Sequence, residues 1–383
     1  MLLQWYQKEV NRGGALPCFG PVSARKLAAA IGDKRHLRDI LCHHKERDLV
    51  LKVLITGCAG QVGQAITAHL VKSGYAVRGL DRVESFAGEI DYRSCDLLDA
   101  DALAPHIEGM DAVLHLAAIP SPGRAPNAEI FQINTAGTFN VFDACAHYGI
   151  NRVVCVSSIN AVGYFFGAVP FELDYLPTDE DHPKLPSDAY SFSKQVTEEI
   201  GQYFWHRDQI SNTCLRFGAG LRPIEQMRET MADAMRSARD LVDALGAMSA
   251  AQHTVEVQRM RAAYDAERRE RRWEKRDGKK SVLSPGEQHL ITLRQNFFSF
   301  VALEDACHAM EQSLTASYDG SHPLLIVDRN NTLMADAAQL AQLMYPDVAV
   351  RGPLEGTQSL VDWRRAADLI GFEAQVTAAA LFE

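Results

Sequence analysis

The sequence predicts an α/β fold, a doubly wound parallel sheet with a smaller, mostly helical C-terminal lobe. From Val50 onward, short β-rich apolar runs alternate with helical stretches, which is typical of parallel strands joined by crossover helices. The first run contains Val53-Leu54-Ile55 without polar alternation, as a strand buried on both faces requires. That run leads into a loop with three glycines and then into a helical stretch.

The order of apolar runs and helical stretches gives the expected elements. Strands are expected over 51–55, 76–80, 112–116, 152–156, 213–216 and 324–327, and helices between them over 62–73, 99–107, 128–148 and 190–206. Residues 224–293 interrupt the alternation with a long charged helical segment, and helices are expected again over 303–314, 336–344 and 359–370.

Within the charged segment, the stretch 267–280 holds eight basic and four acidic residues around one Trp. Basic residues with an aromatic residue can indicate RNA binding. The acids are interleaved with the basic residues, however, which favours a solvent-facing amphipathic helix with ion pairs.

The overall charge and the cysteine usage exclude several classes of protein. Lys and Arg number 39 against 49 Asp and Glu, a net charge of −10, so we expect no nucleic-acid or membrane partner. The eight cysteines form no C-x-x-C pair, which predicts reduced thiols in a cytoplasmic protein. Cys42-His43-His44 lacks further ligands, so no metal site is expected. We find no membrane span and no export signal.

The glycine loop predicts a dinucleotide site. Gly57 permits a turn that a Cβ would obstruct, Gly60 lets backbone N–H groups reach a pyrophosphate, and Gly63 lets the helix pack closely on the sheet. Asp81 ends the next strand, 18 residues after Gly63, where a carboxylate can accept hydrogen bonds from ribose hydroxyls. An acid there favours NAD over NADP, although the adjacent Arg82 could attract a 2′-phosphate.

Tyr190 and Lys194 lie four residues apart and thus on one face of a predicted helix. A tyrosine with a pKa near ~10 is a poor base, but an ammonium one turn away favours the phenolate. The pair can therefore shuttle a proton, although this spacing alone is common on exposed helices.

Further positions match the pattern set by the loop and this pair. Together they resemble the extended short-chain dehydrogenase/reductase family, the NAD-dependent epimerase/dehydratase-like enzymes, from Val50 onward apart from the helical segment after Ile224. The positions that carry the resemblance are the 56–63 loop, Asp81, Asp96-Leu97, His115 to Ala118, Asn134, Ser157-Ser158, Tyr190 with Lys194, and Phe300 to Asp305.

The resemblance implies roles for individual residues. Tyr190 removes the proton from a substrate hydroxyl, Ser158 holds the same oxygen, and Lys194 anchors the nicotinamide ribose. Ser158 is preferred to Ser157 because it lies five residues before Gly163, the spacing of the family. His115 is interpreted as a packed strand residue. The implied cofactor-binding set is Gly57, Gly60, Gln61, Val62, Gly63, Asp81, Asp96, Leu97, Leu116, Ala117, Ala118, Asn134, Tyr190, Lys194 and Phe217.

Departures from the family pattern reduce the number of reactions that we expect. Ser158-Ile159-Asn160 stands where the sugar-nucleotide dehydratases have Thr-Asp-Glu, so water elimination is not expected. Ala219 and Phe298 stand where the epimerases usually have the Asn and Arg that hold a nucleotide diphosphate. The segments 157–164 and 215–219 are similar to the uronate dehydrogenases, which oxidise a free sugar acid, and the acidic stretch 165–187 should form part of the substrate rim.

We therefore expect an NAD-dependent oxidoreductase that takes hydride from a hydroxyl carbon of a sugar, sugar acid or related polyol. The alternatives are a sugar or nucleotide-sugar epimerase and a non-catalytic NAD(P)-binding regulator. The resemblance also suggests a homodimer through the helices 128–148 and 190–206. The expected organisation is a loosely packed or disordered extension (1–49), an NAD-binding Rossmann core (50–222), a helical insertion of the substrate lobe (223–296), a return to the core (297–330) and the C-terminal substrate lobe (331–383).

Overall fold

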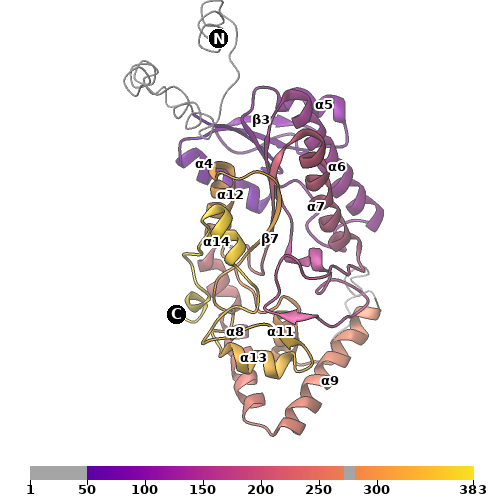
Figure 1. Cartoon of the computed structure of the whole chain (residues 1–383), viewed down its shortest axis with the longest axis vertical. Helices are drawn as coiled ribbons and strands as arrows, with labels where there is room; N and C mark the ends of the chain where they lie inside the picture. Colours follow the sequence, from indigo (N-terminus) through magenta and orange to yellow (C-terminus); the bar gives the residue numbers. More distant parts are fainter. Residues whose placement is uncertain (1–49, 271–280) are drawn as a thin grey trace, which may run out of the picture. The chain divides into compact units, whose positions relative to one another are not determined.

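The computed structural model describes residues 50–270 and 281–383 (Figure 1). The chain divides after Val50 into two units, and the second, Leu51–Glu383, is the one described below. The predictions for residues 1–49, for Cys42-His43-His44 and for residues 271–280 of the charged stretch lie outside the described residues.

The second unit contains a seven-stranded sheet in which every neighbouring pair is parallel. The strand order is β3-β2-β1-β4-β5-β7-β8, so the direction of winding reverses between β1 and β4. This confirms the predicted doubly wound fold. The strands are β1 (Lys52–Thr56), β2 (Ala76–Asp81), β3 (Asp91–Ser94), β4 (Ala112–His115), β5 (Arg152–Val156), β7 (Ser211–Phe217) and β8 (Ser321–Ile326).

Helices cover both faces of the sheet. On one face, α5 (Ala100–Ile107), α6 (Asn127–Tyr148) and α7 (Ala189–Asp208) pack in one apolar cluster with Leu54 of β1. On the other, α4 (Gln61–Lys72), α12 (Leu303–Thr315) and α14 (Arg364–Ile370) pack in a second cluster with Val53 and Ile55. Consecutive β1 residues thus enter opposite cores, which explains the unbroken apolar run.

The structure adds strands that the sequence pattern did not predict. β3 reads Asp-Tyr-Arg-Ser and is mostly exposed, so it carries no apolar run. β6 (Tyr175–Leu176) and β9 (Ala349–Val350) form a separate two-stranded sheet and are too short to show a period. The predicted helix 359–370 begins only at Arg364, because Val361 is bridged to Thr178 in an extended segment.

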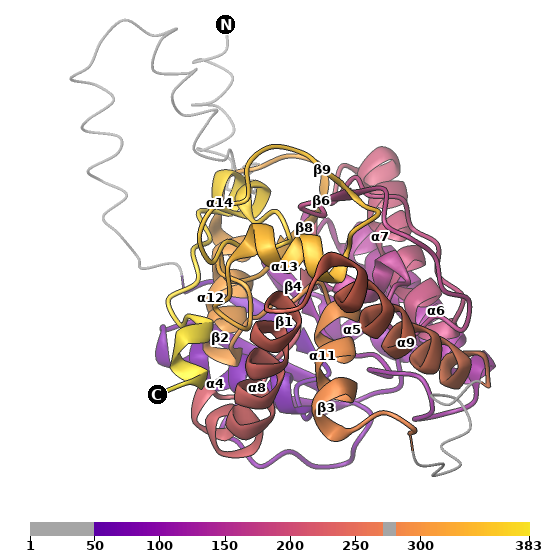
Figure 2. The same cartoon turned by 90° about the horizontal axis from the view of Figure 1, so that it is seen from below.

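Within the described part of the predicted long helical segment lie the helices α8 (Ile224–Gly246), α9 (Ala250–Arg269) and α11 (Pro285–Gln295). Capping boxes at Ser249 and Ser284 start the second and third helices. These helices share one apolar cluster with α13 (Ala337–Met344) and with the 3-10 turn Ala378–Leu381 (Figure 2). Parts of the regions 223–296 and 331–383 therefore share one core, while α14 packs on the sheet.

The first part of the charged stretch 267–280 contradicts the predicted solvent-facing helix at one position. Arg268 is 2% exposed, and its guanidinium donates to the carbonyl oxygens of Tyr164 and Gly167. The planar group satisfies its donors inside the protein, which a mixed-charge sequence pattern does not reveal.

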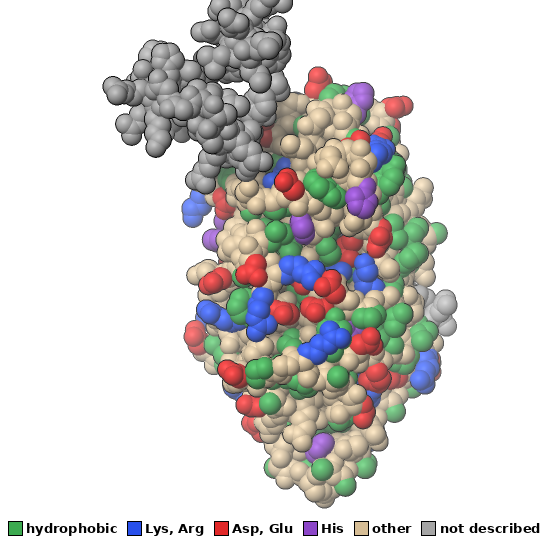
Figure 3. Space-filling model, in the orientation of Figure 1, with side chains coloured by type: hydrophobic (Ala, Val, Ile, Leu, Met, Phe, Trp, Pro, Cys, Tyr) green, Lys and Arg blue, Asp and Glu red, His purple; other side chains and the backbone are tan. Residues whose placement is uncertain are grey.

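The surface of the described chain mixes the two signs of charge. On the face drawn in Figure 3, Lys and Arg side chains alternate with Asp and Glu. Across 50–270 and 281–383, no helix combines the length and apolar character needed to cross a bilayer. In the same ranges, the six cysteines are free and buried, and no group of three or more potential metal ligands is found.

Candidate active site

The predicted site residues come together at the carboxyl ends of β1, β4 and β5. The ends of β1 and β4 flank the point where the strand order reverses, which is where ligands bind in open parallel sheets. The glycine loop follows β1, the turn Leu116–Ala118 follows β4, and Ser157 and Ser158 follow β5. The helix α7 brings Tyr190 and Lys194 to the same place.

The three glycines of the loop differ in how much space surrounds them for a Cβ. Gly57 has a φ of +75°, and a Cβ there would lie 2.6 Å from the amide nitrogen of Ala117. A Cβ at Gly63 would lie 2.1 Å from the carbonyl oxygen of Gly57. At Gly60 the nearest protein atom would be 3.4 Å away, so the fold itself tolerates a methyl group.

Gly60 is exposed at the N-cap of α4, and no side chain caps that helix. The unsatisfied N–H groups of a first helical turn attract an anion. A glycine at this position is therefore explained by a ligand that approaches the backbone closely, and the loop fits the pyrophosphate of a dinucleotide. Gln61 and Val62 form the start of that first turn.

Two carboxylates follow adjacent strands beside the loop. Asp81 ends β2 and is half-buried, with one oxygen 3.1 Å from the Ala59 amide nitrogen and the other 2.8 Å from that of Arg82. Asp96 follows β3 and is exposed, and Leu97 beside it is buried. Because the Cys95 amide donates to the Asp81 carbonyl, the two acids lie on the same edge of the sheet. They could hold the adenosine half of the cofactor.

Asn134 has a structural contact for each of its side-chain groups. Its amide oxygen accepts from the Ile119 N–H at 2.7 Å, and its amide nitrogen donates to the Ile119 carbonyl and to Ser193 Oγ at 2.9 Å. The residue ties the end of the Leu116–Ala118 turn, whose members are half-buried, to the helix that carries Tyr190. Its predicted role in cofactor binding stays a prediction.

Ser158, Tyr190 and Lys194 are all buried and adjacent. Tyr190 is 6% exposed, and the Ser158 side chain is near enough to its hydroxyl to affect the pKa of Tyr190. Lys194 Nζ donates to the Val156 carbonyl oxygen at 2.7 Å and lies 5.9 Å from the centre of the Tyr190 ring. Asp188 caps α7 through the Ser191 N–H and so fixes the helix start two residues before Tyr190.

The pKa of Tyr190 differs from the sequence-based expectation. Burial raises the pKa of Tyr190 to about 12, against a partial lowering by the hydrogen bond with Ser158. Burial also lowers the pKa of Lys194 to about 8. The expected lowering of the tyrosine pKa by the ammonium is thus not found, because both groups are desolvated.

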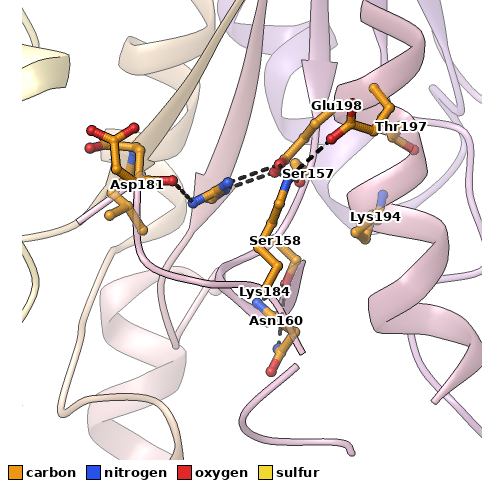
Figure 4. A network of polar contacts seen from close by, with 12 residues as sticks. Ser157, Ser158, Asn160, Asp181, Lys184, Lys194, Thr197 and Glu198 are labelled. Atoms are coloured by element: carbon orange, nitrogen blue, oxygen red, sulfur yellow. Dashed lines mark hydrogen bonds and ion pairs between the residues drawn. The ribbon is translucent and has the colours of Figure 1, made fainter. Parts of the chain in front are cut away.

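A buried polar network lies beside Lys194 (Figure 4). Ser157 Oγ donates to Glu198 Oε1 at 2.9 Å, so this serine faces the core. Arg216 is 1% exposed and donates to both oxygens of Glu198, at 2.7 and 2.8 Å. Lys184 Nζ lies 3.1 Å from the second oxygen. The network connects the loop after β5 to α7 and β7.

The surroundings of the site correct one prediction, that for the acids of 165–187, and leave the predicted cofactor contact of Phe217 a prediction. The acids of 165–187 do not all face a substrate rim: Glu180 is buried and accepts from the Leu325 N–H, and Asp181 pairs with Arg365. Phe217 is 2% exposed at the end of β7, within an apolar cluster. Phe166, which the sequence reasoning missed, packs its ring edge-on against Tyr190 at 5.6 Å between ring centres.

His115 is a packed strand residue, as the sequence analysis interpreted it. Its ring nitrogens lie 2.7 Å from Thr56 Oγ1 and 2.9 Å from Thr138 Oγ1. Thr138 donates its own proton to the Asn134 carbonyl, so the hydrogen-bond pattern assigns the ring proton to Nε2. Burial, with Lys194 as a second cause, lowers the pKa of His115 to about 3.

This lowered pKa predicts a pH-dependent stability. The neutral ring contributes stability that is complete above the unfolded pKa of about 6.5 and is lost as the pH falls toward the folded pKa of about 3. Between pH 7.5 and 5, the wild-type free energy of unfolding should drop by about 2 kcal/mol more than that of His115→Gln. Urea unfolding at several pH values measures both. Parallel curves would contradict the assignment of a buried neutral ring.

Comparison with known proteins places this geometry in a family. Residues 53–246 match the model of the NAD dependent epimerase/dehydratase family. The chain is 28% identical over 183 residues to a uronate dehydrogenase of Pseudomonas syringae pv. tomato, which covers 47% of this chain and 63% of that protein. It is 34% identical over 178 residues to an NAD-dependent glucose-6-phosphate dehydrogenase of Haloferax volcanii, over 43% of this chain and 67% of that protein.

The fold also has solved relatives. A short-chain dehydrogenase/reductase superfamily protein from Agrobacterium tumefaciens, solved with bound NAD, superposes with a TM-score of 0.55 at 22% identity, covering 86% of this chain and 94% of that protein. At this identity the likeness shows the fold alone. The matched region spans less than two thirds of the uronate dehydrogenase named above.

Proposed function

The chain belongs to the NAD dependent epimerase/dehydratase family, with NAD as its cofactor, and on that premise we propose a sugar-oxidising dehydrogenase. Its substrate class is a free sugar, a sugar acid or a related polyol. The observation that carries the proposal is the buried contact between Ser158 and Tyr190, with Lys194 one helical turn away. A protein that only senses the dinucleotide has no need of such a group.

The cofactor supplies the hydride acceptor when bound. The chain supplies the site for the proton. In its deprotonated phenolate form, Tyr190 Oη takes the proton of the substrate hydroxyl and becomes the neutral phenol, and Ser158 Oγ hydrogen-bonds the same substrate oxygen. Lys194 holds the nicotinamide ribose beside the tyrosine. Gly60 and the first turn of α4 take the pyrophosphate, and Asp81 takes the adenosine ribose.

The substrate class rests on similarity and on what the site lacks for a nucleotide diphosphate. The uronate and glucose-6-phosphate dehydrogenases act on sugars without a nucleotide. Ala219 and Phe298 replace the polar residues that the epimerases of this family use, and Phe298 is fully buried. An epimerase remains the second candidate, because the family model itself includes epimerases.

One experiment separates the two candidates. The protein is incubated with NAD and a panel of free sugars, uronates and nucleotide sugars, while NADH absorbance and product stereochemistry are recorded together. Stoichiometric NADH with a free sugar or a uronate supports the dehydrogenase. Inversion at one carbon without net NADH would replace it with the epimerase.

The outer face of α6 and α7 supports a homodimer. Phe139 on α6 and Phe192 and Tyr203 on α7 are 40%, 46% and 47% exposed, and the Phe139 and Tyr203 rings stack on each other. Large apolar groups gathered on one surface mark a protein contact. We propose that a second copy covers them. Light scattering should give twice the chain mass of 42.3 kDa, and a monomer at all concentrations would refute the dimer.

Asp81 should decide the choice of dinucleotide. Asp81→Ala removes charge-assisted hydrogen bonds to the ribose worth ~1.5–3 kcal/mol, so NAD should bind about 10- to 150-fold more weakly. The loss of repulsion should improve NADP relative to NAD. Asp81→Asn is the matched control, since it removes the charge and keeps an acceptor for the Ala59 N–H. Calorimetric titration of both dinucleotides tests this, and an unchanged preference in both variants would place Asp81 away from the ribose.

A further inference from the structure

We propose that Arg268, near the end of α9, is a positioning residue for the proton-transfer site. It holds the turn 164–167, and this turn lays Phe166 against Tyr190. The proposal rests on the proposed function for the role of Tyr190. Arg268 and the whole of α9 lie beyond residues 53–246, the part of the chain that the family model matches.

Arg268 makes several polar contacts inside the protein. Its Nε donates to the Gly167 carbonyl at 2.7 Å, and its two terminal nitrogens donate to the Tyr164 carbonyl at 2.9 Å and to Gln295 Oε1 at 3.3 Å. Asp265, one turn earlier, lies 3.5 Å from it. Burying a guanidinium is costly unless its donors are satisfied, so the geometry of this arginine is tightly determined.

The turn that Arg268 holds leaves little free space around it. Gly163 has a φ of +89°, and a Cβ there would lie 2.4 Å from Pro186 Cα. A Cβ at Gly167 would lie 2.6 Å from both the Gly163 carbonyl oxygen and Ser187 Oγ. Pro186 and Ser187 lead directly into Asp188, the cap of α7. The turn therefore packs on the segment that starts the helix of Tyr190.

Phe166 is the residue of the turn that contacts Tyr190. Its ring meets the Tyr190 ring edge-on, at 5.6 Å and 88°. It packs against an apolar cluster formed by Tyr190, Ile119 and Ile130. Phe166 thus covers one side of the tyrosine and keeps water from it, which supports a directed proton transfer.

The length and direction of α9 bring Arg268 to the turn 164–167. In Figure 1 it runs from the far end of the helical lobe toward the loops that follow β5. Its last two turns carry Arg268 and Tyr264, and the Tyr264 ring lies 5.8 Å from the guanidinium carbon. A helix of the substrate lobe therefore fixes a turn of the Rossmann core beside the tyrosine.

The test measures the accessibility of Tyr190 in the full chain, without substrate or cofactor. Tetranitromethane nitrates exposed tyrosines, and peptide mass spectrometry locates the product. Tyr203, 47% exposed, is the internal positive control, and Tyr345, 2% exposed in the helical lobe, reports whether that lobe stays folded. Arg259→Met is the matched control, because Arg259 lies on the same helix with its side chain 47% exposed.

In Arg268→Met, nitration of Tyr190 should rise severalfold toward that of Tyr203 while Tyr345 stays protected. Phe166→Ala should do the same, and the double variant should add nothing, because both changes act through one contact. Arg259→Met should match wild type. Arg268→Lys keeps the charge but lacks the planar fork, so it should give partial labelling of Tyr190.

Two results would overturn the proposal. One is a Tyr190 that stays as protected as in wild type in a folded Arg268→Met or Arg268→Lys protein. The other is joint labelling of Tyr190 and Tyr345 in both variants, which would show that Arg268 only holds the lobe together. Neither result touches the proposed function, since the labelling requires no turnover.

Discussion

Tyr190→Phe should lower turnover on the true substrate by ~10²–10⁴-fold while leaving NAD affinity close to wild type. The change removes the hydroxyl that we propose as the proton acceptor and keeps the ring that packs against Phe166. Wild-type oxidation should also speed up as the pH rises, because the raised pKa leaves the phenol mostly protonated at neutral pH. Steady-state kinetics across pH, with NAD binding measured separately, test both statements.

Two further variants act as controls on that result. Ser158→Ala loses a hydrogen-bond donor but keeps the base, so its turnover should fall by less than that of Tyr190→Phe. Lys194→Met should damage turnover and NAD affinity together, because the ammonium serves both. A Tyr190→Phe enzyme with wild-type turnover and an unchanged pH profile would remove Tyr190 from the chemistry and favour the regulatory alternative.

Arg216→Met should destabilise the protein by ~3–5 kcal/mol, because it leaves Glu198 buried without its main partner. Burial alone raises the pKa of Glu198, and Arg216 and then Lys184 lower it below its usual value. The glutamate is therefore ionised in the folded protein. The free energy of unfolding from urea titration measures the effect.

The exposed ion pair of Arg236 with Asp233 offers a matched control. Arg236→Met should leave the stability unchanged within error, because its partner is fully in water. Replacing both buried partners, as in Glu198→Leu with Arg216→Met, should cost less than the sum of the single changes. Equal effects of Arg216→Met and Arg236→Met would show that the buried network does not hold the core.

The Rossmann half could be predicted from sequence because its constraints are local. Gly57 and Gly63 are required by backbone contacts within the β1–α4 unit, and the run at Val53 follows from two-sided burial. β3 was not predicted because its residues are mostly exposed and polar and contain no apolar run. It is a strand because it pairs with β2. Short-range pattern thus identifies the strands that make the core.

The surroundings of the tyrosine depend on long-range contacts that no spacing rule reveals. Arg268 donates hydrogen bonds to carbonyl groups about a hundred residues earlier in the chain. Glu180 accepts a hydrogen bond from the N–H of Leu325 in β8, which lies much later in the chain. Both residues carry charges that sequence patterns assign to the surface. Their burial depends on partners that only the fold brings near, and the same holds for Phe166 against Tyr190.

The central claim is that hydride leaves a hydroxyl-bearing carbon of a sugar while Tyr190 takes the proton. Deuterium placed on the hydroxyl-bearing carbons of the free sugars and uronates in the panel tests it directly, with mass spectrometry of the nicotinamide product. We predict one deuterium per NADH formed by the wild-type enzyme and a transfer rate at least ~10²-fold lower in Tyr190→Phe. NAD that binds but receives no deuterium from any member of the panel, or equal transfer in the two proteins, would contradict the claim.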